Sequence, residues 1–256
     1  MRGLCSPALG RANEVPVVPS FDVLAQAAVS TLKISVPTVI QGASGTLTAE
    51  VCNQRLESWS RELVQQAGIR IEVTGRERLP RNEAFVVMSN HQSHYDIPVL
   101  FQALGIPLRM VAKKELFRIP VMSQAMRAAG FVELDRTNRT SAIRTLSEAR
   151  SRLDQAISIW IAPEGTRSKT GRLSSFKKGG FHLAVQAGMR ILPVAIDGTR
   201  FALPAGGLTV TRGATAHVTI ESPIDPAQYS NAKISALVSA VRAAIEQHLP
   251  AELRAD

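Results

Sequence analysis

The chain has 256 residues, of which 45% are hydrophobic and 20% charged, so it can form one folded domain with a substantial core. This composition excludes a chain that is disordered throughout. The formal net charge is +9, and residues 101–200 account for the excess with 17 basic and 7 acidic residues. A cationic central region indicates either a solvated basic face or contact with an anionic ligand or surface.

The cysteine content and the apolar runs restrict the class of protein further. Cys5 and Cys52 are the two cysteines, which excludes a disulfide framework and a thiolate zinc cluster. We find no uninterrupted apolar run of about 18 residues, the length expected of a spanning helix, and the first residues lack the apolar core of a signal peptide. The sequence therefore predicts a soluble or peripheral cytoplasmic protein.

The first 68 residues are predicted to form a lead-in and an amphipathic helix pair, a candidate membrane-docking element. Residues 1–20 contain three prolines and indicate a loose lead-in. Residues 21–36 carry apolar side chains at helical spacing, which predicts an amphipathic helix that ends at Pro37. A glycine-containing break follows, and a second helix is expected over residues 46–66.

From residue 69 onward, β-rich runs alternate with helical patterns. Strands are expected over residues 69–74, 84–89, 108–112, 157–162, 191–196 and 216–220. Helices are expected over residues 97–104, 121–129, 140–153, 180–187 and 231–249. This alternation predicts an α/β protein, with a single layered domain over residues 69–256 whose mixed sheet is flanked by helices.

The first polar cluster, residues 89–96 (SNHQSHYD), stands where an apolar strand ends, a common place for sites in α/β proteins. On a regular helix, His91 and Asp96 would lie about 140° apart. We therefore expect a loop that folds back over a helix with Asp96 in its first turn. A carboxylate on one imidazole nitrogen leaves the other free to accept a proton from a hydroxyl. A structural histidine, or metal binding by His91 and His94, would explain the same residues.

The second polar cluster, residues 159–168 (IWIAPEGTRS), also follows a predicted strand. Its turn could present Arg167 to a phosphate or carboxylate, while Glu164 orients the guanidinium or a ligand hydroxyl. Farther on, Lys177 and Lys178 stand beside two glycines before a predicted helix, whose first backbone amides favour an anion. An ordinary surface turn with an ion pair would explain these residues as well.

Two further segments, residues 113–136 and 191–199, complete a pattern with the two clusters. In this order and spacing, the four segments resemble the four sequence blocks of the 1-acylglycerol-3-phosphate acyltransferase (lysophosphatidic acid acyltransferase) family. The resemblance covers about residues 69–220. Its most specific elements are NHQS followed by Asp96, and PEGTR at residues 163–167.

The resemblance implies transfer of a fatty acyl group from an acyl-CoA or acyl carrier protein thioester to the free hydroxyl of 1-acylglycerol-3-phosphate, giving phosphatidic acid in phospholipid biosynthesis. It implies no cofactor and no metal. His91 would be the base and Asp96 would orient it. The residues implied to bind substrate are Arg136, Glu164, Gly165, Thr166, Arg167, Lys177, Lys178 and Pro193, the last at the acyl-donor or acyl-chain site.

Family members often begin with hydrophobic membrane helices, whereas this chain offers an amphipathic pair. We therefore expect peripheral attachment to the cytoplasmic face of the cell membrane, through the first helix and the basic central region. The alternative is that the first helix packs its apolar face on the core. The loop over residues 200–213 matches none of the four blocks.

Three other functions compete with this interpretation. A hydrolase could use Ser93, but the chain contains no Gly-x-Ser-x-Gly elbow. A non-catalytic lipid- or nucleic-acid-binding module could use the basic region, although aromatic residues are few and are not interleaved with it. Within the enzyme class, another lysolipid could be the acceptor.

Overall fold

The structure is a computed structural model that describes residues 18–80, 82–134, 151–152, 155–229 and 234–254. Arg136 and nearly all of the helix expected over residues 140–153 lie outside the described residues.

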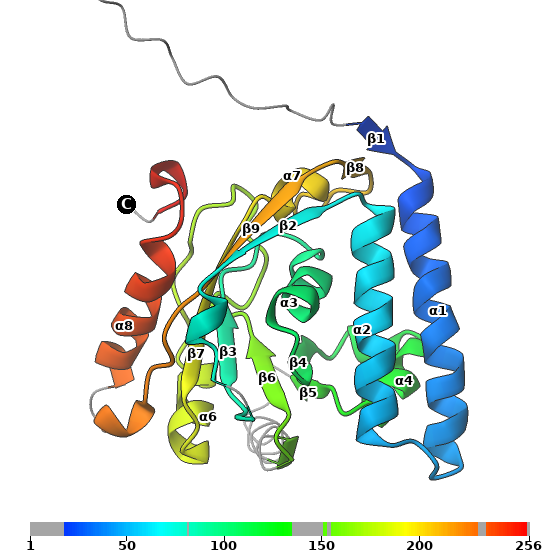
Figure 1. The fold of residues 1–256 in the computed structure, drawn as a ribbon, viewed down its shortest axis with the longest axis horizontal. Coiled ribbons are helices and arrows are strands. Elements are labelled where there is room, and N and C mark those ends of the chain that lie inside the picture. The colour runs from blue at the N-terminus through cyan, green and yellow to red at the C-terminus, as the bar shows by residue number, and fades with distance from the viewer. Residues whose placement is uncertain (1–17, 81, 135–150, 153–154, 230–233, 255–256) are drawn as a thin grey trace, which may run out of the picture.

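A seven-stranded mixed sheet with the order β2-β9-β7-β3-β6-β4-β5 forms the centre of the fold (Figure 1). Within it, β7 and β9 are antiparallel and the other neighbouring pairs are parallel. The strands are β2 (Arg70–Thr74), β3 (Val86–Ser89), β4 (Leu108–Lys113), β5 (Val132–Leu134), β6 (Ser158–Ile161), β7 (Ile191–Asp197) and β9 (Thr215–Ile220). The predicted α/β class with a mixed sheet is confirmed.

Helices cover both faces of this sheet (Figure 1). One face carries α1 (Asp22–Ala43), α2 (Ala49–Gln66), α3 (Asp96–Leu104) and α4 (Met122–Ala128). The other carries α6 (Gly179–Ala187) and α8 (Ile234–Glu246). The helix pair contributes Val23, Leu56 and Leu63 to the same core cluster as the sheet. The division of the chain into two parts at residue 69 stays a prediction.

Several short elements were not predicted. An antiparallel pair joins β1 (Val18–Ser20) to β8 (Val210–Arg212), and α7 (Thr199–Ala202) follows β7 directly. Elements of three or four residues are too short to show a period in the sequence. Single 3₁₀ turns lie at Arg76–Arg78, Leu116–Arg118, Pro226–Gln228 and Ala251–Leu253.

The prediction that the first helix ends at Pro37 is wrong, because α1 continues through Pro37 to Ala43. Proline removes one helical hydrogen bond, and packing of α1 against α2 and α4 compensates for this loss. An 18-residue window of this helix has a mean hydropathy of 1.5, so by length and composition α1 is long and apolar enough to cross a membrane. The sequence interpretation required an uninterrupted apolar run and therefore did not identify this helix, which Gln26 and Lys33 interrupt, as a candidate span.

The side of α1 that faces the protein is unusually polar. Its buried residues include Ser30, Ser35 and Thr38. Gln66 Nε2 donates to Ser30 Oγ at 2.9 Å, and Arg55 Nη1 donates to Thr38 Oγ1 at 3.0 Å. The large apolar side chains that α1 exposes, with exposed fractions between 46% and 63%, are Val29, Leu32, Val36 and Ile40. Val23 and Ile34 of α1 pack on the core, so the helix contacts the core with some apolar side chains and exposes others.

Candidate active site

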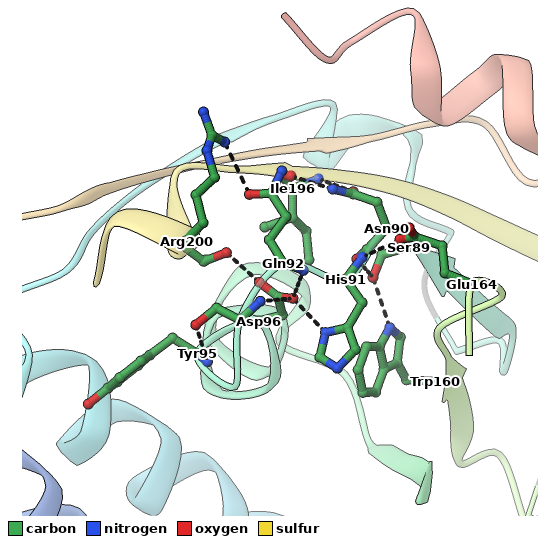
Figure 2. A network of polar contacts seen from close by, with 12 residues as sticks. Ser89, Asn90, His91, Gln92, Tyr95, Asp96, Trp160, Glu164, Ile196 and Arg200 are labelled. Carbon is green, nitrogen blue, oxygen red and sulfur yellow. Dashed lines mark hydrogen bonds and ion pairs between the residues drawn. The ribbon is translucent and has the colours of Figure 1, made fainter. Parts of the chain in front are cut away.

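The first polar cluster forms a turn at the end of β3, and α3 begins at Asp96, as predicted. This turn brings His91 Nδ1 within 2.7 Å of Asp96 Oδ2 (Figure 2). The His91 side chain is 13% exposed, whereas Asp96 is fully buried. Since a carboxylate accepts, Nδ1 carries the proton and Nε2 is left to accept one from a ligand. The predicted meeting of the two side chains is observed.

Asp96 holds the turn together as well as the imidazole. Its Oδ2 also accepts from the backbone N–H groups of Gln92 at 2.7 Å and Ser93 at 2.9 Å. Its Oδ1 accepts from the hydroxyl of Thr199. Hydrogen-bond donors on both oxygens offset the cost of burying a charged carboxylate.

The second polar cluster fixes the backbone of His91 from the opposite side. Glu164 Oε1 accepts from His91 N and its Oε2 accepts from Ser174 N, both at 2.8 Å. Ser168 N donates to His91 O, also at 2.8 Å. Burial raises the pKa of Glu164, and the donors on Ser174 and His91 partly offset this increase. Glu164 therefore positions the histidine, a role that the sequence interpretation did not give it.

Trp160 on β6 supports the imidazole ring. The two ring centroids lie 5.3 Å apart with the planes at 85°, an edge-to-face arrangement. Trp160 Nε1 donates to Ser89 Oγ at 2.9 Å, which fixes the indole (Figure 2). We did not predict this residue, because an aromatic side chain in an apolar strand is normally a core residue.

The His91 ring borders a cavity of about 540 Å³ beside the C-terminal ends of β4 and β6. Three cationic side chains, those of Lys113, Lys114 and Arg167, line it together with one acidic residue, Glu115, so positive charge predominates. Gly165 and Thr166 form part of the same wall. The candidate base thus faces a space that attracts an anionic ligand.

A second cavity of about 270 Å³ lies among α1, α2, α3 and α4. It shares four lining residues with the first cavity, namely His94, Ile97, Met110 and Leu116. Most of its remaining wall is apolar, with Leu56, Trp59 and Phe131 among the larger side chains. An apolar space therefore adjoins the cationic one.

The structure brings together some of the predicted substrate-binding residues but not all of them. Gly165, Thr166 and Arg167 line the cationic cavity with His91. Lys177 and Lys178 are exposed on the approach to α6, and Lys177 lies close to Gly165 without lining either cavity. Pro193 is buried within β7, opposite Met88 of β3.

The second histidine of the cluster, His94, lines both cavities. Loss of hydration beside the surrounding protein atoms is the main cause that lowers the pKa of His94 to about 4. The nearby Arg167 and His91 lower this pKa further, while Asp96 opposes the shift. Solvent reaches His94 through the cavity mouth and weakens these effects, but even a smaller decrease leaves the ring neutral at pH 7.

The alternative nucleophile, Ser93, is engaged within the protein. Its side chain is fully buried. The hydroxyl donates to Leu203 O at 2.7 Å and accepts from Tyr95 N at 3.1 Å. A serine nucleophile needs an exposed hydroxyl beside a base, so this geometry does not support the hydrolase interpretation.

The fold and the site define an α/β protein with a His–Asp pair facing a cationic cavity. A family model described as Acyltransferase matches residues 70–197, half of the chain. The chain therefore belongs to the acyltransferase family, and the resemblance seen in its four segments is confirmed.

Named relatives support the same assignment. The chain is 32% identical over 185 residues to a 1-acyl-sn-glycerol-3-phosphate acyltransferase of Chlamydomonas reinhardtii, covering 72% of this chain and 54% of the relative. It is 39% identical over 131 residues to 1-acyl-sn-glycerol-3-phosphate acyltransferase alpha of Mus musculus, covering 51% and 46%. The chain thus spans about half the length of these curated relatives.

A solved structure is similar over nearly its whole length. The crystal structure of the 1-acyl-sn-glycerophosphate (LPA) acyltransferase from Thermotoga maritima has a TM-score of 0.66 and 28% sequence identity. The match covers 86% of this chain and 94% of that one. The arrangement in Figure 1, with helices on both sides of a mixed sheet, is therefore shared with that enzyme.

Proposed function

We propose that this protein transfers a fatty acyl group from an acyl thioester to the free hydroxyl of lysophosphatidic acid, giving phosphatidic acid. The observation that carries the proposal is the His91–Asp96 pair on the wall of a cavity that Arg167 also lines. A base and a fixed cation in one cavity suit an acceptor that has both a hydroxyl and a phosphate.

The reaction is a direct transfer. Nε2 of His91 accepts the proton of the acceptor hydroxyl while the oxygen attacks the thioester carbonyl carbon. The carbon–sulfur bond then breaks, and the departing thiol takes the proton from His91, so the base is regenerated. Asp96 keeps the proton on Nδ1 and stabilises the imidazolium that forms between the two steps.

The cations of the first cavity and the apolar wall of the second suggest where the two parts of a lipid lie. The Arg167 guanidinium can form two hydrogen bonds with a phosphate, and Lys113 and Lys114 add positive charge. The adjoining apolar cavity provides a space for an acyl chain, since burying each methylene there contributes about 0.8 kcal/mol.

The substrates can be identified in one set of assays. Purified protein should receive labelled acyl-CoA and acyl carrier protein thioesters, each with lysophosphatidic acid or with other lysolipids, and the products should be separated. We expect phosphatidic acid to be the main product. Preferred acylation of a lysolipid with another headgroup would replace lysophosphatidic acid as the acceptor, and the absence of any acylated lipid would contradict the proposal.

Replacing Arg167 with alanine should raise the KM for lysophosphatidic acid more than the KM for the thioester. The loss of a charge-assisted contact of about 1.5 to 3 kcal/mol corresponds to an increase of about 10- to 100-fold. Steady-state kinetics with each substrate varied in turn measure this, with the exposed Lys169→Ala as the matched control. An effect confined to the thioester would show that the two substrates are placed the wrong way round.

The protein reaches its lipid substrate, we propose, through α1 lying in the surface of a membrane. α1 exposes a row of large apolar side chains and makes polar contacts on its protein side, so an apolar surface is available to lie in an interface. The basic residues of the central region would add attraction to anionic lipid, which salt screens. We propose the cytoplasmic face of the membrane as the location.

A triple variant in which serine replaces Leu32, Val36 and Ile40 should bind vesicles about 100-fold more weakly. The reason is that about 1 kcal/mol of apolar burial is lost at each of these half-exposed sites. Flotation with phosphatidylcholine vesicles containing phosphatidylglycerol, at low and high salt, measures this. The control carries Ala236→Ser and Ala243→Ser on α8, at the far side of the molecule (Figure 1). Unchanged binding by the triple variant would exclude α1 as the docking element.

A further inference from the structure

Residues 196–203, from the end of β7 to just after α7, form several hydrogen bonds with residues 89–96, the turn that carries His91 and Asp96 (Figure 2). The amide of Asn90 exchanges hydrogen bonds with the backbone of Ile196, donating to O at 2.7 Å and accepting from N at 2.8 Å. The other contacts join Gln92 to Arg200, Ser93 to Leu203 O, and Asp96 to Thr199. A segment about 100 residues away in sequence thus forms a rigid support for the turn.

One of these contacts bears directly on the His–Asp pair. Three groups donate to Oδ2 of Asp96, and one of them is the imidazole. Oδ1 accepts from the Thr199 hydroxyl, and both side chains are fully buried. Among the described residues, Thr199 is the side chain that donates to this oxygen. The two carboxylate oxygens are therefore fixed from two different elements.

The backbone conformation just before Thr199 directs the Thr199 side chain toward Asp96. Gly198 has φ +96°, and a Cβ atom there would lie 2.0 Å from Thr215 O, so a larger residue does not fit. Asp197 Oδ1 accepts from Gly198 N at 2.8 Å and from the Arg200 guanidinium. These contacts fix the turn that places the Thr199 hydroxyl on Asp96.

We propose that Thr199 is a positioning residue for the general base, acting through Asp96. A carboxylate can rotate about its Cβ–Cγ bond, and a donor on Oδ1 keeps Oδ2 in line with Nδ1 of His91. Thr199 does not line either cavity, so it orients the pair without touching substrate. The effect on turnover rests on the proposed function, but the effect on the imidazole does not.

The test compares Thr199→Val, which keeps the shape and removes the hydroxyl, with Thr199→Ser, which keeps the hydroxyl. We expect Thr199→Val to lower kcat by about 10- to 100-fold with both KM values unchanged, as for a lost hydrogen bond to a charged group. Thr199→Ser should stay within about threefold of the native enzyme.

A second readout does not need turnover. In nitrogen-15 NMR of the His91 ring, the native protein and Thr199→Ser should show the proton held on Nδ1, whereas Thr199→Val should show a mixture of tautomers. Thr199→Ala replaces Thr199→Val if circular dichroism shows that the valine variant does not fold.

A folded variant without the hydroxyl that keeps the native kcat and the native tautomer would overturn the proposal for Thr199. So would a loss of kcat that serine does not restore. If the native protein acylates no lysolipid, the proposed function fails, and the NMR comparison alone then decides the role of Thr199.

Discussion

Replacing His91 with alanine is expected to lower kcat for acyl transfer by about 10²- to 10⁴-fold, the usual effect of losing a positioned general base. The side chain is partly exposed at the cavity, and the contacts that fix its backbone, to Glu164 and Ser168, remain available in the variant. The fold should therefore persist. Steady-state kinetics measure the effect, and circular dichroism with thermal unfolding verifies the fold.

His94→Ala provides the matched control for this prediction. His94 borders the same cavity, but within the described part of the chain no carboxylate forms a hydrogen bond with its ring, whereas Asp96 holds the ring of His91. We expect His94→Ala to change kcat by less than about tenfold. A folded His91→Ala protein with native activity, or a larger loss in His94→Ala than in His91→Ala, would contradict the assignment of the base.

Replacing Asp96 with asparagine should lower kcat by about 10²- to 10⁴-fold, since a neutral amide neither stabilises the imidazolium nor secures the productive tautomer. Asparagine has nearly the same shape, so the loss should appear in kcat with little change in KM. Single-turnover kinetics with saturating thioester and lysolipid separate the chemical step from binding.

Asp96→Ala should show a different combination of effects. The backbone donors of Gln92 and Ser93 and the hydroxyl of Thr199 would lose their acceptor inside the protein. Each unsatisfied buried group costs about 1 to 3 kcal/mol, so the alanine variant should also unfold at a lower temperature. If Asp96→Asn retained the native kcat, the carboxylate would have no part in the reaction.

The spacing between His91 and Asp96 predicted the local backbone conformation, which the two residue types alone do not. Five residues cannot place both side chains on one helical face, so a turn followed by a helix start was required, and α3 does begin at Asp96. The larger strands and helices were likewise predictable, because each has enough residues to show its period. The layered α/β fold followed from the alternation of these elements.

The supports of the turn could not be predicted in the same way. Thr199 and Asn90 act through partners about 100 residues distant, and hydrogen bonds of that kind leave no local pattern in a single sequence. Trp160 looked like a core residue, and Glu164 looked like a partner for Arg167 rather than for the His91 backbone. In each case a tertiary contact decided the role.

The direction of α1 was also set by tertiary contacts. The sequence gives it alternating apolar and polar residues but does not say which side packs inward. Hydrogen bonds from Arg55 and Gln66 hold its serine and threonine side against α2, which leaves Leu32 and Ile40 outside. Pro37 suggested an end to the helix, yet packing carries the helix through it.

Simultaneous measurement of thiol release and of acylated lipid, with and without lysophosphatidic acid, distinguishes direct acyl transfer from hydrolysis of the thioester. We expect one acylated lipid for each thiol released, no release above background without acceptor, and neither product from His91→Ala at the native rate. Thiol release that yields free fatty acid in the absence of an acceptor would show hydrolysis of the thioester and would contradict direct transfer.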